Sequence, residues 1–443
     1  MDFDLLIFGG SVVSSEGLVL ADVGVKDGKI VAVEPSLSGS ANERLDATGL
    51  IVMPGAIDTQ VHFREPGLEH KEDLATGSLA AMCGGVTSFL EMPNTNPTTT
   101  TREALDDKLA RATGRCWSNF GFFFGASPSN VHLLAEAETW PGVPGIKVFA
   151  GSSTGDLLVK DDVHLRQVMS AVHGRVAFHS EDEDRNVARK ALLSDTPHAR
   201  EHPFLRDAES ARLCTERILA IAEETDCAVH ILHISTADEL PLLADAKARG
   251  LKVTCEVTPQ HLWFVAPECY DQLGTLAQMN PPLRSAEHNA ALWTALEDGL
   301  FDVFGSDHAP HTLEEKAKPY PASPSGMPGV ETLLPVLLTF VSQGRLTLEK
   351  LIEMLCERPA SLYSMVGKGH IATGFDADIS IVDPSETWVV DQSKLHSKCG
   401  WSPYDGVSLT GRVKTVVVGG TVSLREGEVS GVANGRVIEF GKR

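Results

Sequence analysis

Short apolar runs alternate with amphipathic stretches through the middle of the chain. Residues rich in Ala, Leu, Glu and Arg separate these runs, for example in Arg102–Ala112, Asp207–Thr225 and Thr236–Arg249. Apolar strands alternating with helices indicate an α/β fold with parallel strands, and eight such runs favour a (β/α)8 TIM-type barrel over an open sheet. The eight predicted strands are Ile57–Phe63, Thr87–Met92, Asn119–Phe124, Gly145–Phe149, Val176–Ser180, Ala228–Ile234, Lys252–Val257 and Asp302–Ser306.

Both ends of the chain show a different pattern, with short β-like runs broken by glycine. Near the start, Asp27-Gly28 separates two apolar runs, which is a hairpin signal. Similar runs return at Ile379–Val382, Val413–Val418 and Thr421–Ser423. Neither end has enough apolar residues for a core of its own. We therefore predict a small β-sandwich domain built from residues 1–50 plus 372–443, with a catalytic barrel over residues 51–371 between its two parts.

Polar side chains collect at the predicted strand ends, where barrel enzymes carry their chemistry. In the first strand, the period of two places Asp58, Gln60, His62 and Arg64 on one face. The alternative for this strand is an exposed edge. Lys147 stands among apolar residues, either as a buried amine of lowered pKa or as a side chain that reaches the surface.

Histidines and an aspartate end three further strands. His179 ends the fifth, and His230 and His233 lie in the sixth, where the odd spacing allows only one of them to face inward. Asp307 follows the eighth and could also cap a helix. Single histidines are usually core or surface residues. Several imidazoles with a carboxylate, however, suit Zn²⁺ or a similar metal, which lowers the pKa of bound water.

Charge and composition limit the kinds of binding partner that we expect. The net charge of −22 argues against nucleic acid or an anionic membrane and leaves a small molecule as the expected ligand. We expect no signal peptide at the acidic start and no membrane span, because the longest apolar stretch, near Leu333–Val341, is short and contains Pro335. Eight cysteines without a CxxC pair indicate reduced thiols in a cytoplasmic protein. A homodimer is the default assembly.

Four motifs carry a family resemblance. They are His62–Gly67 (HFREPG), Glu91–Thr95 (EMPNT), Asn280–Arg284 (NPPLR) and Ser306–His311 (SDHAPH), and Gly374–Asp378 (GFDAD) closes the pattern. With these motifs the chain resembles the cyclic amidohydrolases, and most closely the dihydroorotases, nearly end to end. The resemblance implies a two-metal centre in a barrel.

The resemblance also assigns the metal ligands by position. His62 matches a ligand of one metal, and His179 and His233 match the ligands of the other. Lys147 matches the lysine that combines with CO₂ to form a bridging carbamate, and Asp307 matches a ligand that also shuttles the proton. Gln60 stands where the family has a histidine, so we expect one tightly bound Zn²⁺ and a second that is weak or absent. Gln260 replaces another frequent histidine.

The resemblance implies a substrate as well. Arg64, Asn94 and His311 match positions that hold a carboxylate, Asn280 matches a contact to the pyrimidine ring, and Glu314–Glu331 resembles a covering loop. The leading hypothesis is a zinc-dependent dihydroorotase, in which metal-bound hydroxide and an aspartate interconvert dihydroorotate and N-carbamoyl-L-aspartate in pyrimidine biosynthesis. The alternatives are an allantoinase or hydantoinase, or a catalytically silent homologue that serves as a partner of aspartate transcarbamoylase.

Overall fold

The structure, a computed structural model of the chain, describes residues 2–14, 17–151 and 156–441. Its largest sheet has nine strands in the order β18-β17-β16-β15-β5-β1-β2-β3, with β4 beside β1. These strands are β1 (Phe3–Ser14), β2 (Gly17–Lys26), β3 (Lys29–Glu34), β4 (Ala41–Asp46), β5 (Ile51–Pro54), β15 (Ile379–Val389), β16 (Ser408–Val418), β17 (Thr421–Arg425) and β18 (Glu428–Val429).

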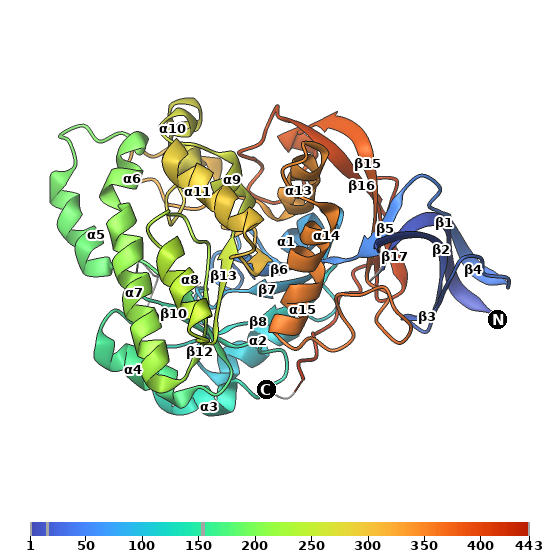
Figure 1. Cartoon of the computed structure of the whole chain (residues 1–443), viewed down its shortest axis with the longest axis horizontal. Helices are drawn as coiled ribbons and strands as arrows, with labels where there is room; N and C mark the ends of the chain where they lie inside the picture. The colour runs from blue at the N-terminus through green and yellow to red at the C-terminus, as the bar shows by residue number, and fades with distance from the viewer. Residues whose placement is uncertain (1, 15–16, 152–155, 442–443) are drawn as a thin grey trace.

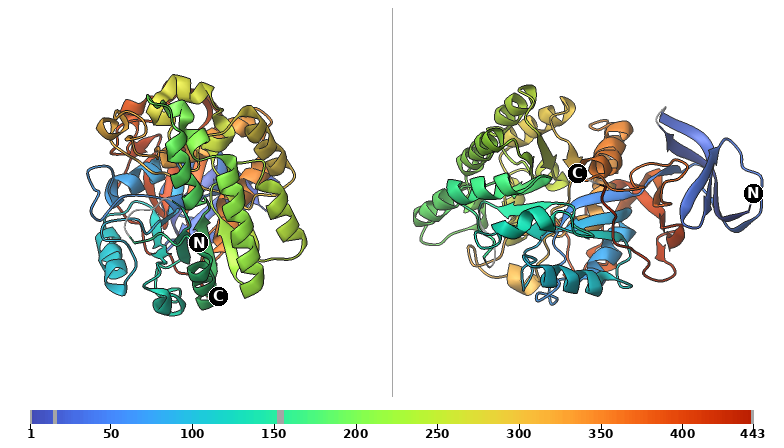
Figure 2. Two further views of the ribbon diagram at one scale, coloured as in Figure 1. Left: turned by 90° about the vertical axis from the view of Figure 1, so that its left-hand side faces the viewer. Right: turned by 90° about the horizontal axis from the view of Figure 1, so that it is seen from below.

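This sheet joins the two ends of the chain. Strand β5 pairs in parallel with β1 and antiparallel with β15, so early and late strands share one ladder. The predicted hairpin is confirmed, because β2 and β3 pair around Asp27 and Gly28, whose φ angles of 50° and 76° suit a tight turn. The N-terminal strands project from one end of the molecule, away from the helices α5 and α7 (Figures 1 and 2).

The remaining strands form two parallel sheets at the centre of the molecule, in the orders β6-β7-β8 and β14-β13-β12-β11-β10-β9. Only Phe123 separates β8 from β9. A parallel bridge joins Val61, at the end of β6, to His308, beyond β14. Each of the eight predicted runs overlaps one of these strands or, in one case, two. They are β6 (Ala56–Val61), β7 (Val86–Glu91), β8 (Asn119–Phe122), β9 (Phe124–Gly125), β10 (Ile146–Phe149), β11 (Arg175–His179), β12 (Ala228–Ile231), β13 (Val253–Val257) and β14 (Val303–Phe304).

Helices connect the parallel strands, which gives the α/β fold that the alternation predicted. The predicted bounds match α2 and nearly match α7, whereas α8 starts later than expected because Thr236 donates its hydroxyl and amide hydrogens to the Glu239 carboxylate. The helices are α1 (Leu74–Cys83), α2 (Arg102–Ala112), α3 (Leu134–Ala137), α4 (Asp162–Ala171), α5 (Glu183–Arg189), α6 (His202–Leu205), α7 (Ala208–Thr225), α8 (Leu240–Ala248), α9 (Pro259–Trp263), α10 (Glu268–Leu273), α11 (Ala286–Glu297), α12 (Leu313–Lys316), α13 (Leu333–Ser342), α14 (Leu348–Ile352) and α15 (Arg358–Leu362).

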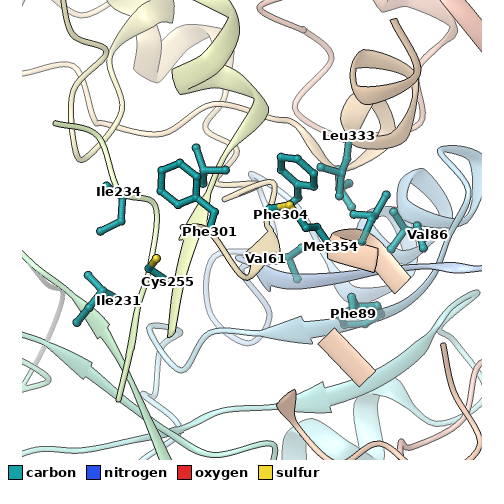
Figure 3. Packing of buried hydrophobic residues seen from close by; sticks show 14 of the residues in the cluster. Val61, Val86, Phe89, Ile231, Ile234, Cys255, Phe301, Phe304, Leu333 and Met354 are labelled. Atoms are coloured by element: carbon teal, nitrogen blue, oxygen red, sulfur yellow. The ribbon is translucent and has the colours of Figure 1, made fainter. Parts of the chain in front are cut away.

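The main core lies between the parallel strands and the surrounding helices. Figure 3 shows part of it, including Val61 and Phe89 from the strands and Leu333 from a helix. The rings of Phe63 and Phe89 pack with centroids 4.7 Å apart. Helix α1 approaches so closely that a Cβ on Gly77 would lie 2.5 Å from the Phe63 ring. This packing holds the segment that follows β6, where the predicted site begins.

Two expectations about the whole chain can also be compared with the structure. All eight cysteines are free thiols, and all but Cys83 are buried. The apolar stretch near Leu333 forms α13, which packs on β16 through a hydrogen bond from the Thr339 hydroxyl to the Thr410 carbonyl, 3.2 Å long. Among the described residues, no helix combines the length and the apolar character that crossing a membrane requires.

Candidate active site

The five predicted metal ligands lie in the parallel strands or just after them. His62 follows β6, Lys147 is in β10, His179 ends β11, and His233 and Asp307 follow β12 and β14. All five side chains are buried. Because parallel strands bring their carboxyl ends to one edge, these residues face a common region. The exposed-edge alternative for the first strand is wrong, since every residue of β6 is buried.

His179 and His233 form one pair. His179 Nδ1 lies 3.1 Å from His233 Nε2, and its Nε2 lies 2.8 Å from Glu181 Oε2. Glu181 also accepts a hydrogen bond from Arg206 Nε at 3.0 Å. Although burial opposes the shift, the Arg206 charge and the His179 hydrogen bond hold the pKa of Glu181 well below its usual range. Glu181 therefore accepts a hydrogen bond from the protonated Nε2 of His179. The lone pair of Nδ1 is left facing His233.

The ambiguity in the sixth strand is resolved by contacts. His230 points elsewhere, with Nδ1 2.8 Å from the Thr254 hydroxyl and its ring centroid 6.3 Å from that of Tyr363. His233 instead joins His179. Only His233 therefore belongs to the candidate site, and it lies just beyond β12, where the strand period no longer applies.

Lys147 is wholly buried, so the alternative in which its side chain reaches the surface is wrong. Its Nζ has no hydrogen-bond partner in the described part of the chain and lies 4.4 Å from the Phe149 ring centroid. Burial lowers the pKa of Lys147 to about 7, against the opposing charges of Asp307 and Glu256. An amine with this pKa is substantially uncharged near neutral pH, which is the form that reacts as a nucleophile.

Glu256 lies close to Lys147, and our sequence reasoning missed it. Its carboxylate accepts from the Thr59 hydroxyl at 2.8 Å and from the His233 amide at 3.3 Å. Burial raises the pKa of Glu256 to about 8. Gly305 leaves the space for this side chain, because a Cβ there would lie 2.3 Å from Glu256 Oε2. The available signal was a charged residue inside the apolar run Lys252–Val257.

His62 and Asp307 form the second pair. His62 Nε2 lies 3.2 Å from Asp307 Oδ1, and its Nδ1 lies 2.7 Å from Asn94 Oδ1. Because an amide oxygen only accepts, Nδ1 carries the proton and the Nε2 lone pair faces Asp307. Gln60 donates its amide hydrogen to the same Asp307 oxygen at 3.0 Å. Gln60 therefore acts as a donor to Asp307, and its buried Oε1 has no hydrogen-bond partner among the described residues.

Three of these residues have left-handed backbone conformations. Arg64, His233 and Asp307 have φ angles of 67°, 37° and 43°. Residues other than glycine rarely adopt this backbone conformation, which costs about 1–3 kcal/mol per residue. Each lies within a few residues of a strand end, where the turn redirects the side chain toward the site. No pattern of apolar and polar residues predicts this feature.

Arg64 and His311 lie together beside Asp307. Arg64 Nε donates to the Pro310 carbonyl at 3.1 Å, and its guanidinium lies 3.3 Å from His311 Nε2. His311 Nε2 lies 3.0 Å from the Ser325 carbonyl oxygen, and Nδ1 lies 3.1 Å from Lys71 Nζ. Because a carbonyl only accepts, His311 carries its proton on Nε2 and accepts from Lys71 at Nδ1. Burial and the nearby cations lower the pKa of His311, which keeps it neutral.

Lys71 is a further residue that our sequence reasoning missed. It pairs with Glu315 at 3.1 Å while it contacts His311. In the sequence it lies within a charged stretch, residues 69–73, which gives no local sign of a site. Together, Arg64 and Lys71 place two cationic side chains on either side of His311. This arrangement suits an anionic group such as a carboxylate.

Asn280 has a different hydrogen-bond partner from the other predicted residues. Its Oδ1 is 3.0 Å from His202 Nε2, and in the described chain no hydrogen bond joins it to the metal-ligand candidates. The segment from Glu314 to Glu331 is ordered by Lys316. Lys316 Nζ donates to the carbonyls of Gln278, Pro324 and Gly326 at 2.9–3.0 Å. These bonds hold Ser325 of the same segment against His311.

The cluster fits bound metal ions. Lys147 Nζ and Gln60 Oε1 are buried polar atoms without hydrogen-bond partners among the described residues. The facing nitrogens of His179 and His233 are 3.1 Å apart, near the separation of about 3.3 Å expected for two nitrogens on one tetrahedral zinc ion. His62 Nε2 and Asp307 Oδ1 face each other as two acceptors. Imidazoles with a carboxylate are suitable zinc donors.

Comparisons with known proteins agree with this geometry. The Amidohydrolase family matches residues 51–423. A dihydroorotase from Halobacterium salinarum is 37% identical over 428 residues, which cover 91% of this chain and 96% of that protein. An allantoinase from Rubrobacter xylanophilus is also 37% identical, over 445 residues that cover 98% and 97% of the two chains.

A solved structure is similar over almost the whole chain. The L-hydantoinase (dihydropyrimidinase) from Arthrobacter aurescens superposes with a TM-score of 0.92 at 32% identity, covering 97% of this chain and 98% of that one. The relatives thus act on different cyclic amides by their names, while they share one family. The chain therefore belongs to the amidohydrolase family, and it is a hydrolase of the cyclic amidohydrolase group that includes the dihydroorotases.

Proposed function

We propose that this chain is a metal-dependent dihydroorotase that interconverts dihydroorotate and N-carbamoyl-L-aspartate in pyrimidine biosynthesis. The observation that carries the proposal is the buried guanidinium of Arg64, which lies 3.3 Å from His311 Nε2 and interacts with the Asp307 charge, whereas the charge of Lys71 is already paired with Glu315. Dihydroorotate carries a carboxylate next to its ring amide, whereas allantoin and unsubstituted hydantoin carry none. A buried guanidinium next to the acid–base group favours the charged substrate.

The proposed metal ligands divide into two sets. Lys147, His179 and His233 would hold one Zn²⁺ tightly, with Lys147 as a carbamate formed from CO₂. His62, Asp307 and a share of that carbamate would hold a second ion weakly, because the Gln60 amide donates to Asp307. When bound, such metals polarise the amide carbonyl and lower the pKa of water.

The residues of this chain would supply the remaining steps. Arg64 binds the substrate carboxylate through its planar fork and orients the ring. His311, with its proton on Nε2, donates to the same carboxylate once Ser325 releases it. Asp307 takes a proton from the attacking water and gives it to the ring nitrogen as the C–N bond breaks. The segment from Glu314 to Glu331 covers the substrate and excludes water.

The fold that we propose for this chemistry is a closed (β/α)8 barrel over residues 51–371. The bridge between Val61 and His308 supports closure on one side, and the single residue between β8 and β9 supports it on the other. Residues 1–50 and 372–443 would form the accompanying β-sandwich domain. The barrel would bring the ends of its first and last strands, with Gln60 and Asp307, next to each other.

A second candidate is an allantoinase or hydantoinase. The observation that favours it is the sequence identity to the Rubrobacter allantoinase, which at 37% equals the identity to the Halobacterium dihydroorotase. The catalytically silent alternative rests on Gln60 alone, while the other predicted ligands are present.

The test is turnover of dihydroorotate, allantoin and dihydrouracil by the purified protein in zinc-supplemented buffer. We expect dihydroorotate to give the largest kcat/KM. Arg64→Ala serves as the matched comparison, because it should selectively reduce the rate with dihydroorotate. A larger kcat/KM for allantoin or dihydrouracil would overturn the dihydroorotase assignment. No turnover of any substrate, together with no bound metal, would favour the silent homologue.

A further inference from the structure

A second group of metal-ligating side chains lies outside the candidate active site. Cys83 ends α1, Glu331 lies in a short 3₁₀ helix, Val330–Thr332, and His396 lies in the connection between β15 and β16. One ligand atom from each of the three lies within 4.8 Å of the others. Among the described residues this is the one group of three or more such side chains with that spacing. The group therefore joins a helix beside the parallel strands to a segment of the nine-stranded sheet.

The hydrogen bonds fix the orientation of His396. Its Nδ1 lies 2.8 Å from Glu331 Oε1, and its backbone amide donates to Glu331 Oε2 at 2.7 Å. Since the carboxylate accepts, Nδ1 carries a proton and the other ring nitrogen is left for another partner. Zinc-binding histidines are usually oriented by such a carboxylate on the non-ligating nitrogen.

The second ring nitrogen of His396, Nε2, faces a thiol. His396 Nε2 lies 3.8 Å from Cys83 Sγ. A zinc ion bound at about 2.3 Å from sulfur and about 2.0–2.1 Å from nitrogen separates those atoms by about 3.6 Å in tetrahedral geometry. Little movement is thus needed to admit an ion between them. In the metal-free protein the Cys83 thiol can donate a hydrogen bond to the Nε2 lone pair of His396. The thiol proton then lies between the two atoms, where the metal ion would bind.

Solvent reaches this group. A cavity of about 560 Å³ is lined by all three residues, and its wall also includes two acidic and two basic residues, Asp391, Glu428, Lys394 and Arg412. Side chains of His396 and Glu331 are 30% and 12% exposed. Cys83 is only partly buried, unlike the other seven cysteines. An ion can therefore enter without unfolding, and water can complete its coordination.

We propose that Cys83 and His396 bind a thiophilic divalent cation such as Zn²⁺, with Glu331 as the residue that orients His396. On binding, the S–H bond of Cys83 breaks, a sulfur–metal bond forms, and the proton passes to solvent. His396 contributes its Nε2 electron pair, and no redox change occurs. The ion would link α1 to the connection between β15 and β16. Neither proposed ligand, Cys83 or His396, belongs to the candidate active site, and Glu331 is the last residue of the segment proposed to cover the substrate.

The test uses Co²⁺ as the probe, because cobalt bound to a thiolate gives a sulfur-to-metal charge-transfer absorption in the near ultraviolet. None of the residues placed in the candidate active site is a cysteine, so cobalt bound there does not contribute this band. We expect titration of the purified protein to give the band with a stoichiometry of one and the release of one thiol proton per ion.

Three variants sharpen the result. Cys83→Ser and His396→Gln should each abolish the charge-transfer band or remove its high-affinity phase in the cobalt titration. Turnover should remain unchanged in both variants. Glu331→Gln should keep the band but weaken the cobalt affinity about 10–100-fold, as expected for the loss of an orienting carboxylate. Cys227→Ser is the matched control, because its buried thiol donates to the Ala228 carbonyl and has no imidazole partner. Absence of the band in the folded wild-type protein, or its persistence in Cys83→Ser, would overturn the proposal.

Discussion

The strand ends that carry Lys147, His179 and His233 differ in construction from the region that carries Gln60, His62 and Asp307. In the first region, Glu181 and Arg206 support His179, and two facing nitrogens lie 3.1 Å apart. In the second, Asn94 orients His62, but an amide hydrogen of Gln60 occupies the Asp307 oxygen. The first region has the electron pairs proposed to bind a metal, whereas the second holds the groups proposed to transfer the proton and to bind the anion.

Under the proposed function, the comparison accounts for a glutamine at a position where a metal ligand is expected. A glutamine at position 60 reduces the electron pairs available for metal in the second region, yet it donates to the carboxylate that is proposed to move the proton. Arg64 and His311, which adjoin Asp307, place the anion site in the same region. We therefore expect substitutions in the second region to change turnover and substrate affinity, and substitutions in the first to change metal retention and stability.

The largest effect is expected for Asp307→Asn. Asparagine preserves the shape but cannot accept the proton from water, and loss of general acid–base catalysis costs about 10²–10⁴-fold in rate. Steady-state kinetics with dihydroorotate should show the loss in kcat, while circular dichroism remains unchanged. A near-normal kcat would remove Asp307 from the proton transfer and would break the proposed division between the two regions.

The first region can be tested through the pH dependence of stability. The folded-state pKa of Lys147, about 7, lies below the usual value of 10.5. Between these pH values the unfolded chain binds the additional proton, so the free energy of unfolding of the metal-free, carbonate-free protein should rise with pH, by on the order of 5 kcal/mol. Lys147→Met should remove this rise in urea titrations.

Lys394→Met provides a control for that measurement, since the Lys394 side chain is 81% exposed. It should leave the pH dependence as in the wild-type protein. An unchanged rise in Lys147→Met would mean that the amine of Lys147 is not the group that loses its proton in the folded state.

Arg64→Ala probes the anion site of the second region. Removing a charge-assisted pair with the substrate carboxylate should cost about 2–4 kcal/mol in kcat/KM for dihydroorotate. Metal content and thermal stability should be retained, because the metal-ligand candidates are untouched. Normal kcat/KM for dihydroorotate would show that the carboxylate binds elsewhere.

Gln60→His should make the two regions more alike. A second imidazole restores an electron-pair donor. Changing a residue that only orients a ligand typically alters metal affinity 10–100-fold, and adding a direct ligand should increase the affinity by more, roughly 10²-fold or more. Elemental analysis should then rise from about one metal per chain toward two. Gln260→His is the matched control, because Gln260 donates to the Ser306 carbonyl at 2.7 Å. Two tightly held metals in the wild-type protein would refute the unequal-site prediction.

The smallest effect is expected for Lys71→Met. Losing the donor to His311 Nδ1 should allow the proton to exchange between the two ring nitrogens and should raise KM by about fivefold, or about 1 kcal/mol, with little change in kcat. Nitrogen NMR of His311 should show the mixed tautomers, and Lys71→Arg should restore the wild-type pattern. If the tautomer remains fixed on Nε2, the Ser325 carbonyl alone determines it.

Much of the architecture follows from local patterns along the chain. The alternation of apolar runs and helical stretches predicted all the parallel strands, because burial of a strand or helix face requires a particular spacing of apolar residues. The hairpin at Asp27-Gly28 and the sharing of one sheet by both chain ends were likewise predictable. The identities of His62, His179 and Asp307 also stood out, since polar residues at buried strand ends have few structural explanations.

Other features depend on contacts between residues far apart in the chain. Local spacing could not distinguish a buried Lys147 from one at the surface, because the answer depends on what covers β10. It did not select Lys71, Glu181 or Glu256, whose roles come from hydrogen bonds to partners on other elements. The left-handed backbone at Arg64, His233 and Asp307 is equally non-local, since only the surrounding packing can maintain a conformation that these residues disfavour. Residue types therefore specify the chemistry that is available, whereas packing across the fold places those groups within reach of one another and sets their charges.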